Sequence, residues 1–299
     1  MKIALVIFIT LALAGCALLS LHMGVIPVPW RALLTDWQAG REHYYVLMEY
    51  RLPRLLLALF VGAALAVAGV LIQGIVRNPL ASPDILGVNH AASLASVGAL
   101  LLMPSLPVMV LPLLAFAGGM AGLILLKMLW ASLTDYLMLS RPQDVNNALL
   151  WLTGSLWGRD WSFVKIAIPL MILFLPLSLS FCRDLDLLAL GDARATTLGV
   201  SVPHTRFWAL LLAVAMTSTG VAACGPISFI GLVVPHMMRS ITGGRHRRLL
   251  PVSALTGALL LVVADLLARI IHPPLELPVG VLTAIIGAPW FVWLLVRMR

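Results

Sequence analysis

The chain has 299 residues, of which 61% are hydrophobic and 11% charged, and its mean hydropathy is +1.03. Soluble globular domains are far less apolar, so these values exclude a soluble enzyme or binding module and predict an integral membrane protein. The net charge of +8 comes from basic residues spread through the loops, without the single basic stripe of a nucleic-acid surface. We therefore expect membrane lipid around the chain and no nucleic acid bound to it.

Nine apolar runs follow one another along the chain. About 20 helical residues cross a bilayer core, and five runs come close to that length or reach it, while four are shorter or interrupted. Since no stretch between them could form a soluble domain, we predict one all-α membrane domain over residues 1–299, with about ten helices. In chain order the runs are Ile3–Leu21, Leu55–Ile72, Ala91–Met103, Leu106–Leu126, Ile166–Phe181, Phe207–Cys224, Pro226–Met238, Leu249–Leu267 and Gly280–Val296.

The basic residues also predict the topology. Most of them fall on one side of the membrane if both termini are cytoplasmic, as the positive-inside rule requires. This orientation predicts that the charged stretch Gly191–Gly199 is cytoplasmic.

The alternating topology fails at one place. Between the runs that end near Lys127 and begin at Ile166 the chain must cross the membrane once, yet only a short apolar stretch after Leu129 is available for the crossing. Either the fifth helix is a half-span or part of the chain is missing there. We favour the second interpretation and predict a break in the backbone near Leu129–Trp130.

The sequence contains no motif for catalysis. No lysine follows a glycine, which excludes the GK pair of a P-loop, and the HExxH, GxSxG and CxxC patterns are missing as well. We therefore predict no catalytic residue and no metal site in this chain. The acid most deeply placed in a span is Asp265, and because Arg269 follows four residues later, we favour a local ion pair over a proton relay.

Two polar segments interrupt the apolar pattern with Gly and Pro, namely Gln73–His90 and Gly225–Arg239. Irregular backbone at membrane depth is tolerated only where protein or a water-filled path covers it, so such breaks favour a transport pathway. The candidates that we take from these segments are Gln73, Asn78, Pro79, Ser228 and Phe229.

The stretch GDARATTLGV (residues 191–200) predicts a short helix of about two turns. Gly191 permits a turn, Asp192 favours a helix N-terminus, and Gly199 suits a left-handed C-terminal cap. Ala193 and Thr196 or Thr197 share one face, which a partner could approach closely, with Leu198 as a projecting side chain. By itself this pattern fits a contact with a partner and a plain connector equally well.

Six motifs together resemble a known family. They are RLPRLLLA (51–58), LIQGIVRNPLASPDILG (71–87), WLTGSLWGRDW (151–161), LGDARATTLGVSV (190–202), GPISFIGLVVPHMMR (225–239) and ELPVGVLTAIIGAPWFVWLL (276–295). In this order they resemble the membrane permeases of bacterial ABC importers for ferric siderophores, haem and vitamin B12. The resemblance is greatest to the permeases for iron(III) citrate. Members have about ten helices, so the missing first half of the fifth helix is a departure from the family.

The resemblance implies a single transmembrane permease domain of the type II ABC importer fold, with broken or re-entrant segments, in the bacterial inner membrane. It implies a second, non-identical permease subunit, two copies of a cytoplasmic P-loop ATPase and a periplasmic binding protein. This chain would bind no cofactor, since ATP and Mg belong to the ATPase. The chain would not be an enzyme but would carry a ferric chelate, here iron(III) citrate, to the cytoplasm by alternating access.

The resemblance also implies roles for particular residues. It makes residues 191–199 the coupling helix that contacts the ATPase (Gly191, Asp192, Ala193, Arg194, Ala195, Thr196, Thr197, Leu198 and Gly199). It assigns binding-protein docking to Arg51, Arg54 and Arg269, and a re-entrant segment beside the pathway to Gly154 and Ser155. The alternatives are interfacial anchoring for Arg51 and Arg54, and the Asp265 pair for Arg269. For the whole chain, the alternative is a secondary transporter or channel that needs no ATPase.

Overall fold

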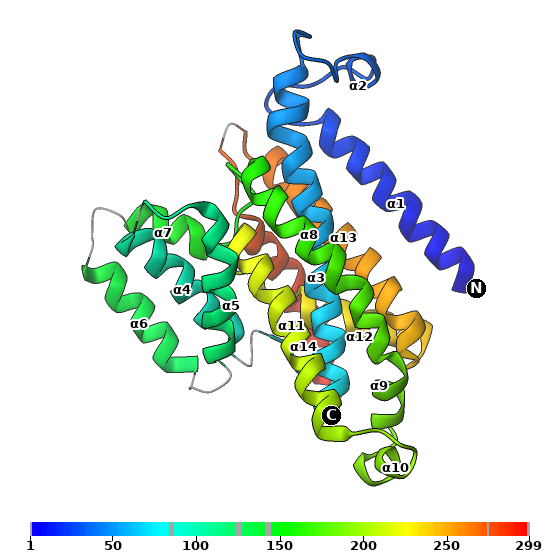
Figure 1. Cartoon of the computed structure of the whole chain (residues 1–299). Coiled ribbons are helices and arrows are strands. Elements are labelled where there is room, and N and C mark those ends of the chain that lie inside the picture. The colour runs from blue at the N-terminus through cyan, green and yellow to red at the C-terminus, as the bar shows by residue number, and fades with distance from the viewer. Residues whose placement is uncertain are drawn as a thin grey trace.

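The structure is a computed structural model that describes residues 2–83, 87–103, 105–122, 127–140, 145–273 and 275–297 (Figure 1). All regular elements within these residues are helical, which confirms the predicted all-α class. They are α1 (Lys2–His22), α2 (Ala32–Thr35), η1 (Tyr45–Arg51), α3 (Leu52–Val76), α4 (Val88–Leu102), η2 (Val108–Val110), α5 (Leu111–Gly122), α6 (Lys127–Ser140), α7 (Val145–Leu152), α8 (Trp161–Ser178), η3 (Leu179–Phe181), α9 (Cys182–Leu188), α10 (Asp192–Thr197), α11 (Val202–Cys224), α12 (Ile230–Thr242), α13 (His246–Ile270) and α14 (Val279–Arg297).

Several of these helices are long and apolar enough to cross a membrane. By length and composition, five segments qualify: Ile3–His22, Tyr45–Val76, Trp161–Leu188, Val202–Cys224 and His246–Ile270. Three shorter apolar helices accompany them, at Val88–Leu102, Leu111–Ala121 and Val279–Trp293. The predicted count of about ten membrane helices is therefore not confirmed, although a chain that crosses the membrane several times is supported.

Helix α3 forms the centre of the bundle and packs against α8, α11, α12 and α13 (Figure 1). Glycines allow its backbone to approach two of these helices closely. A Cβ atom on Gly62 would lie 2.4 Å from the carbonyl oxygen of Gly257 in α13, and one on Gly69 would lie 1.9 Å from that of Gly231 in α12. In lipid, where apolar exclusion does not drive helices together, such close contacts hold a bundle together.

Helices α4, α5, α6 and α7 form a group beside this bundle (Figure 1). A second apolar cluster, which includes Leu111, Ala115, Trp151 and Val221, joins the group to α11. Because α11 also packs on α3, it connects the group to the central bundle.

The predicted break near Leu129–Trp130 is wrong. These residues lie within one continuous helix, α6, which runs for 14 residues. At about 1.5 Å per residue α6 spans roughly 21 Å, against about 30 Å for a bilayer core. The backbone is therefore continuous at these residues, and α6 is shorter than a helix that crosses a bilayer core.

Candidate functional site

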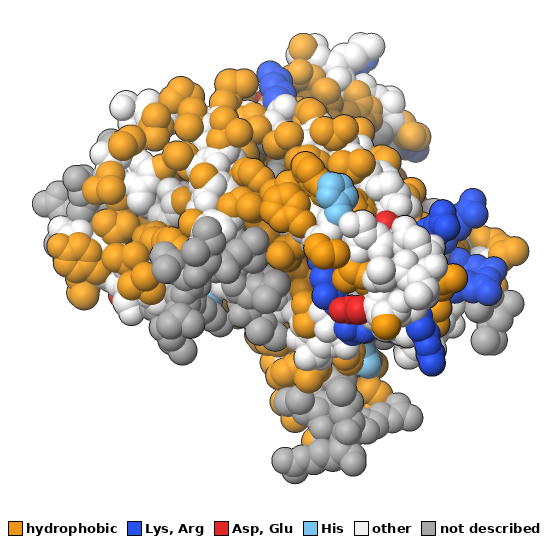
Figure 2. Space-filling view, turned by 60° about the horizontal axis from the view of Figure 1, so that its bottom comes forward, with side chains coloured by type: hydrophobic (Ala, Val, Ile, Leu, Met, Phe, Trp, Pro, Cys, Tyr) orange, Lys and Arg blue, Asp and Glu red, His pale blue; other side chains and the backbone are white. Residues whose placement is uncertain are grey.

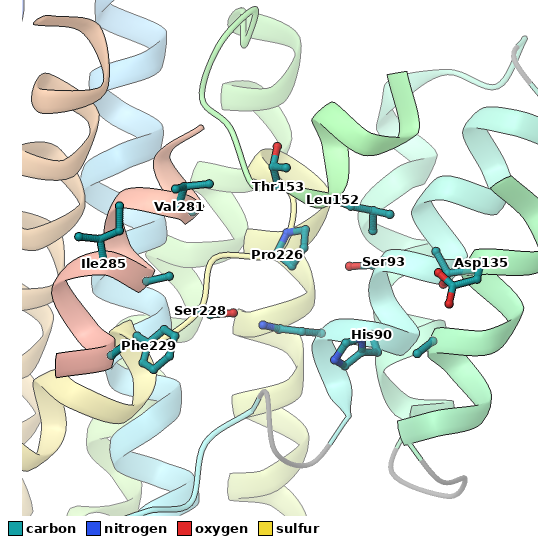
Figure 3. A pocket seen from close by; sticks show the side chains of 16 residues that line it. His90, Ser93, Asp135, Leu152, Thr153, Pro226, Ser228, Phe229, Val281 and Ile285 are labelled. Carbon is teal, nitrogen blue, oxygen red and sulfur yellow. The ribbon is translucent and has the colours of Figure 1, made fainter. Parts of the chain in front are cut away.

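A cavity of about 790 Å³ lies between the α4–α7 group and α14, with the segment between α11 and α12 beside it (Figure 3). Val281, Ile285 and Phe229 occupy one side in Figure 3, and His90, Ser93 and Asp135 occupy the other. The described residues that line the cavity are Asn89, His90, Ser93, Ala131, Thr134, Asp135, Leu152, Thr153, Pro226, Ser228, Phe229, Gly280, Val281, Ala284, Ile285 and Ala288.

The chemistry of this lining suits transient contact with a polar solute. Amide, hydroxyl and imidazole groups of α4, α6 and the loop at Ser228 offer hydrogen bonds, while α14 contributes apolar side chains. Asp135 is the acid of the lining, and no Lys or Arg occurs among these lining residues. The described lining can therefore contact a solute through hydrogen bonds on one side and apolar side chains on the other.

The wall at residues 225–229 has a constrained backbone. Phe229 has a φ of 70°, in the left-handed region that costs energy for a residue with a side chain. A Cβ atom on Gly287 would lie 2.4 Å from the Cβ atom of Phe229, so α14 has a glycine where Phe229 approaches it. The surrounding structure therefore holds Phe229 in its unusual conformation against α14.

Gly154 and Ser155 fix the end of α7 to this wall. The backbone N–H of Ser155 donates to the carbonyl oxygen of Cys224 over 2.8 Å, and that of Gly280 donates to Gly154 over 3.0 Å. A Cβ atom on Gly154 would lie 2.4 Å from the carbonyl oxygen of Pro226. The two residues support the cavity wall, and their neighbour Thr153 lines the cavity itself.

Of the pathway candidates, Ser228 and Phe229 line the cavity, whereas Gln73, Asn78 and Pro79 do not. Gln73 is fully buried in α3, and its Nε2 donates to the carbonyl oxygen of Leu232 over 3.2 Å. The Oδ1 of Asn78 accepts from the backbone N–H of Leu80 over 2.9 Å and closes the turn that contains Pro79.

Sequence reasoning missed the α4 and α6 side of the cavity. Asn89 and Ser93 are four residues apart, a spacing that places them on one helical face and could have identified them. Thr134 and Asp135 gave no such signal, because they lie in the stretch that we expected to be interrupted.

A network of buried charges occupies the end of the bundle near α2. Arg54 Nε lies 2.7 Å from Asp265 Oδ1, and Arg54 Nη1 lies 2.6 Å from Glu276 Oε2. Arg269 Nη2 lies 3.1 Å from Asp265 Oδ2, which confirms the predicted pair. The side chains of Arg54 and Asp265 are 2% and 1% exposed, so these charges compensate one another away from solvent.

All three arginines predicted to dock the binding protein lie at this end, but they are bonded within the chain. Arg51 donates to the backbone oxygens of Leu21, His22 and Ile26, and Arg269 donates to the backbone oxygen of Ser20 over 3.0 Å. Arg51 and Arg269 are each 3% exposed. In this conformation their guanidinium groups hold α1, α3 and α13 together, and their docking role stays a prediction.

The predicted short helix at Gly191–Gly199 forms at the opposite end as α10, between α9 and α11 (Figure 1). Gly191 and Gly199 have φ values of 104° and 86°, as turns around a short helix require. Within the helix Ala195 is buried, whereas Ala193, Thr196, Thr197 and the following Leu198 are exposed.

Basic side chains gather around this helix. Figure 2, which brings this end of the molecule forward, shows a group of Lys or Arg side chains (blue) with Asp or Glu (red) among them, while hydrophobic side chains (orange) cover much of the other described surface in this view. The arginines of the elements that meet here are Arg77, Arg183, Arg194, Arg206, Arg245, Arg247 and Arg248.

Apolar helices that surround a cavity with hydrogen-bonding groups define a membrane transport protein. The chain belongs to the FecCD transport family, whose profile matches residues 10–130 and 121–297. It is 94% identical to the Fe(3+) dicitrate transport system permease protein FecD of Escherichia coli strain K12, over 318 aligned positions that cover all of both chains. It is 41% identical to the Fe(3+)-citrate import system permease protein YfmE of Bacillus subtilis, over 97% of this chain and 94% of that one.

A solved structure shows the same fold. It is described as an inward-facing conformation of a metal-chelate type ABC transporter, and it covers 99% of this chain and all of its own, with 29% identity and a TM-score of 0.87.

The comparisons also explain the short α6. The family profile matches in two pieces, and both pieces include residues 121–130. The alignment with the E. coli relative has 318 positions, whereas this chain has 299 residues, so part of the relative has no counterpart here. Together these findings indicate that a segment present in the family is missing at or near residues 121–130, which include the start of α6, and they confirm the prediction that part of the chain is missing in this region.

Proposed function

We propose that this chain is a permease subunit of an ATP-driven importer and that it carries iron(III) citrate from the periplasm to the cytoplasm by alternating access. The observation that supports this most strongly is the identity of 94%, over the full chain, with an Fe(3+) dicitrate permease. The cavity beside α14 is this subunit's half of the pathway, which a second, similar permease subunit completes.

The proposal places the α10 end in the cytoplasm, with both termini of the chain on that side. Two copies of a P-loop ATPase hold ATP and Mg there, and one of them contacts the exposed small face of α10. The arginines around α10 support this orientation, because basic residues favour the cytoplasmic side. A periplasmic binding protein docks at the α2 end.

Docking through Arg51, Arg54 and Arg269 requires each guanidinium group to exchange an internal partner for a carboxylate of the binding protein. At the same end Arg31 and Arg41 are exposed, and a carboxylate reaches them without such an exchange. The binding protein therefore meets these two arginines first.

Reconstitution tests the function. The chain, its second permease subunit, the ATPase and the binding protein are placed in proteoliposomes, and uptake of radiolabelled iron citrate is measured with and without ATP. We expect uptake only with ATP and all partners present. Uptake by this subunit alone would instead support the secondary transporter or channel.

A further inference from the structure

One carboxylate oxygen joins three elements at the α10 end. Asp192 Oδ1 lies 3.0 Å from Nη2 of Arg77 and also 3.0 Å from Nη2 of Arg206. Asp192 begins α10, Arg77 follows the last residue of α3, and Arg206 lies in the first turns of α11. A single acceptor atom therefore connects the short helix to the ends of two long ones.

The first connection leads to the α4 side of the cavity. Arg77 has a φ of 55°, which ends α3 sharply, and the side-chain bond from Asn78 to Leu80 closes the next turn. The backbone N–H of Val88 then donates to the carbonyl oxygen of Pro83 over 3.3 Å, at the start of α4. A displacement of Arg77 therefore acts on the helix that carries Asn89, His90 and Ser93.

The second connection leads to the wall formed by residues 225–229. Arg206 lies on α11, which is buried at every residue from Leu212 to its last residue, Cys224. The next residue, Gly225, begins the segment that carries Pro226, Ser228 and Phe229 into the cavity. An axial shift or rotation of α11 therefore moves the cavity wall that faces α4.

The ion pairs themselves add little to the stability of the fold. The side chains of Arg77, Asp192 and Arg206 are 40%, 43% and 35% exposed. Solvent screens pairs of this kind, and each contributes about 1 kcal/mol or less. Their position between α10 and the ends of α3 and α11 is therefore the more informative property.

We propose that Asp192 is the positioning residue that transmits movement of α10 to both walls of the cavity, through Arg77 and Arg206. This inference rests on the proposed function, in which the ATPase moves α10. It assigns Asp192 a role within the subunit, in addition to the contact that its helix makes with the ATPase.

The Asp192→Asn variant tests the role, because it keeps the shape of the side chain and removes its charge. In the complete reconstituted complex we expect ATP-dependent uptake to fall by between about twofold and about thirtyfold, the range of coupling effects within a protein. ATP hydrolysis and assembly are measured on the same samples, so that a weakened ATPase contact appears as less assembled complex, whereas loss of transmission appears as less uptake per assembled complex. Asp192→Glu should retain most of the uptake, and Arg248→Gln is the matched control for a charge change at the same end.

A double-mutant cycle separates transmission from a local effect. If Asp192 acts through Arg77, the double variant Asp192→Asn, Arg77→Gln should lose no more uptake than the more affected single variant. Multiplicative losses, or uptake by Asp192→Asn equal to that of the unmodified complex, would overturn the proposal.

A distance measurement keeps the test independent of the transported solute. Spin labels on the exposed residues Leu190 and Leu100 report the separation of the segment before α10 from α4, in a Cys16→Ala background because the other two cysteines are buried. On addition of ATP to the complex, we expect the distance distribution to shift with Asp192 and to stay unchanged with Asp192→Asn. Equal shifts in both proteins would contradict the transmission role even if the complex transported no iron citrate.

Discussion

The charges at the α2 end show what a residue pattern can predict. The pair of Asp265 and Arg269 follows from their spacing on one helix. The third partner, Arg54, is 211 residues from Asp265 in the chain, and only the packing of α3 on α13 brings the two together. Sequence therefore predicted a local pair, whereas the structure contains a network that joins helices.

Removal of Arg54 should destabilise the subunit. The Arg54→Ala variant leaves Asp265 buried beside Glu276 without one of its cations, and loss of one partner of a buried pair costs about 3–5 kcal/mol. We expect a lower free energy of unfolding in detergent, measured by denaturant titration, with Arg31→Ala as the exposed control. A variant of normal stability that fails to bind the binding protein would instead support a docking role for Arg54.

At the scale of elements, apolar runs predicted where most helices lie but not how they are interrupted. The runs at Ile3–Leu21 and Leu55–Ile72 correspond to α1 and α3 within a few residues. The run Leu106–Leu126 was expected to be one helix, yet it contains η2 and α5 as separate elements. Hydropathy reports the length of an apolar stretch, whereas the backbone within it also depends on residues such as Pro107 and Pro112.

Close packing of α3 on α12 gives a prediction for Gly69. The added methyl group of Gly69→Ala would overlap the backbone of Gly231, and overpacking of this kind costs about 1–3 kcal/mol. Gly15 in α1 is the matched control, because a Cβ atom there meets nothing within 4 Å. Thermal unfolding should show that Gly69→Ala lowers the stability, whereas Gly15→Ala leaves it unchanged or raises it slightly. Equal effects of the two substitutions would contradict the close helix contact.

The exposed face of α10 gives a second prediction for an element. Ala193 is exposed, so Ala193→Trp should leave folding of the subunit intact while it blocks close approach of the ATPase. We expect the amount of ATPase retained by the immobilised permease pair to fall at least about tenfold, which corresponds to a loss of about 1.4 kcal/mol of binding free energy. Ala39→Trp, an exposed change at the other end, should retain the ATPase normally. Retention by the Ala193 variant at the level of this control would exclude the contact.

At the scale of the whole molecule, the cavity joins segments that no local pattern connects. Asn89 belongs to α4, Ser228 to the loop that follows α11, and Ala284 to α14. Only the packing of these elements brings the three residues to the same cavity. The polar breaks at residues 73–90 and 225–239 indicated which segments depart from regular helices. They could not indicate that α14 faces both of them, because this depends on the order in which the helices pack.

The segment missing at or near residues 121–130 leads to the last prediction. A helix of 14 residues falls short of the bilayer core by roughly 9 Å, so α6 cannot cover its side of the pathway over the full depth of the membrane. The rest of the subunit, including α10, retains the family fold, so the chain should assemble with its partners. We therefore expect this chain to form the complex but to take up iron citrate slowly.

Inserting the residues of the E. coli relative that have no counterpart in this chain should then raise ATP-dependent uptake by at least about tenfold, which corresponds to a change of about 1.4 kcal/mol in the barrier. The amount of assembled complex should stay the same. An insertion of equal length composed of Gly and Ser is the control, because it restores the length of the chain but not an apolar helix. Equal uptake by the chain with and without the relative's segment would show that a half-span suffices on this side of the pathway.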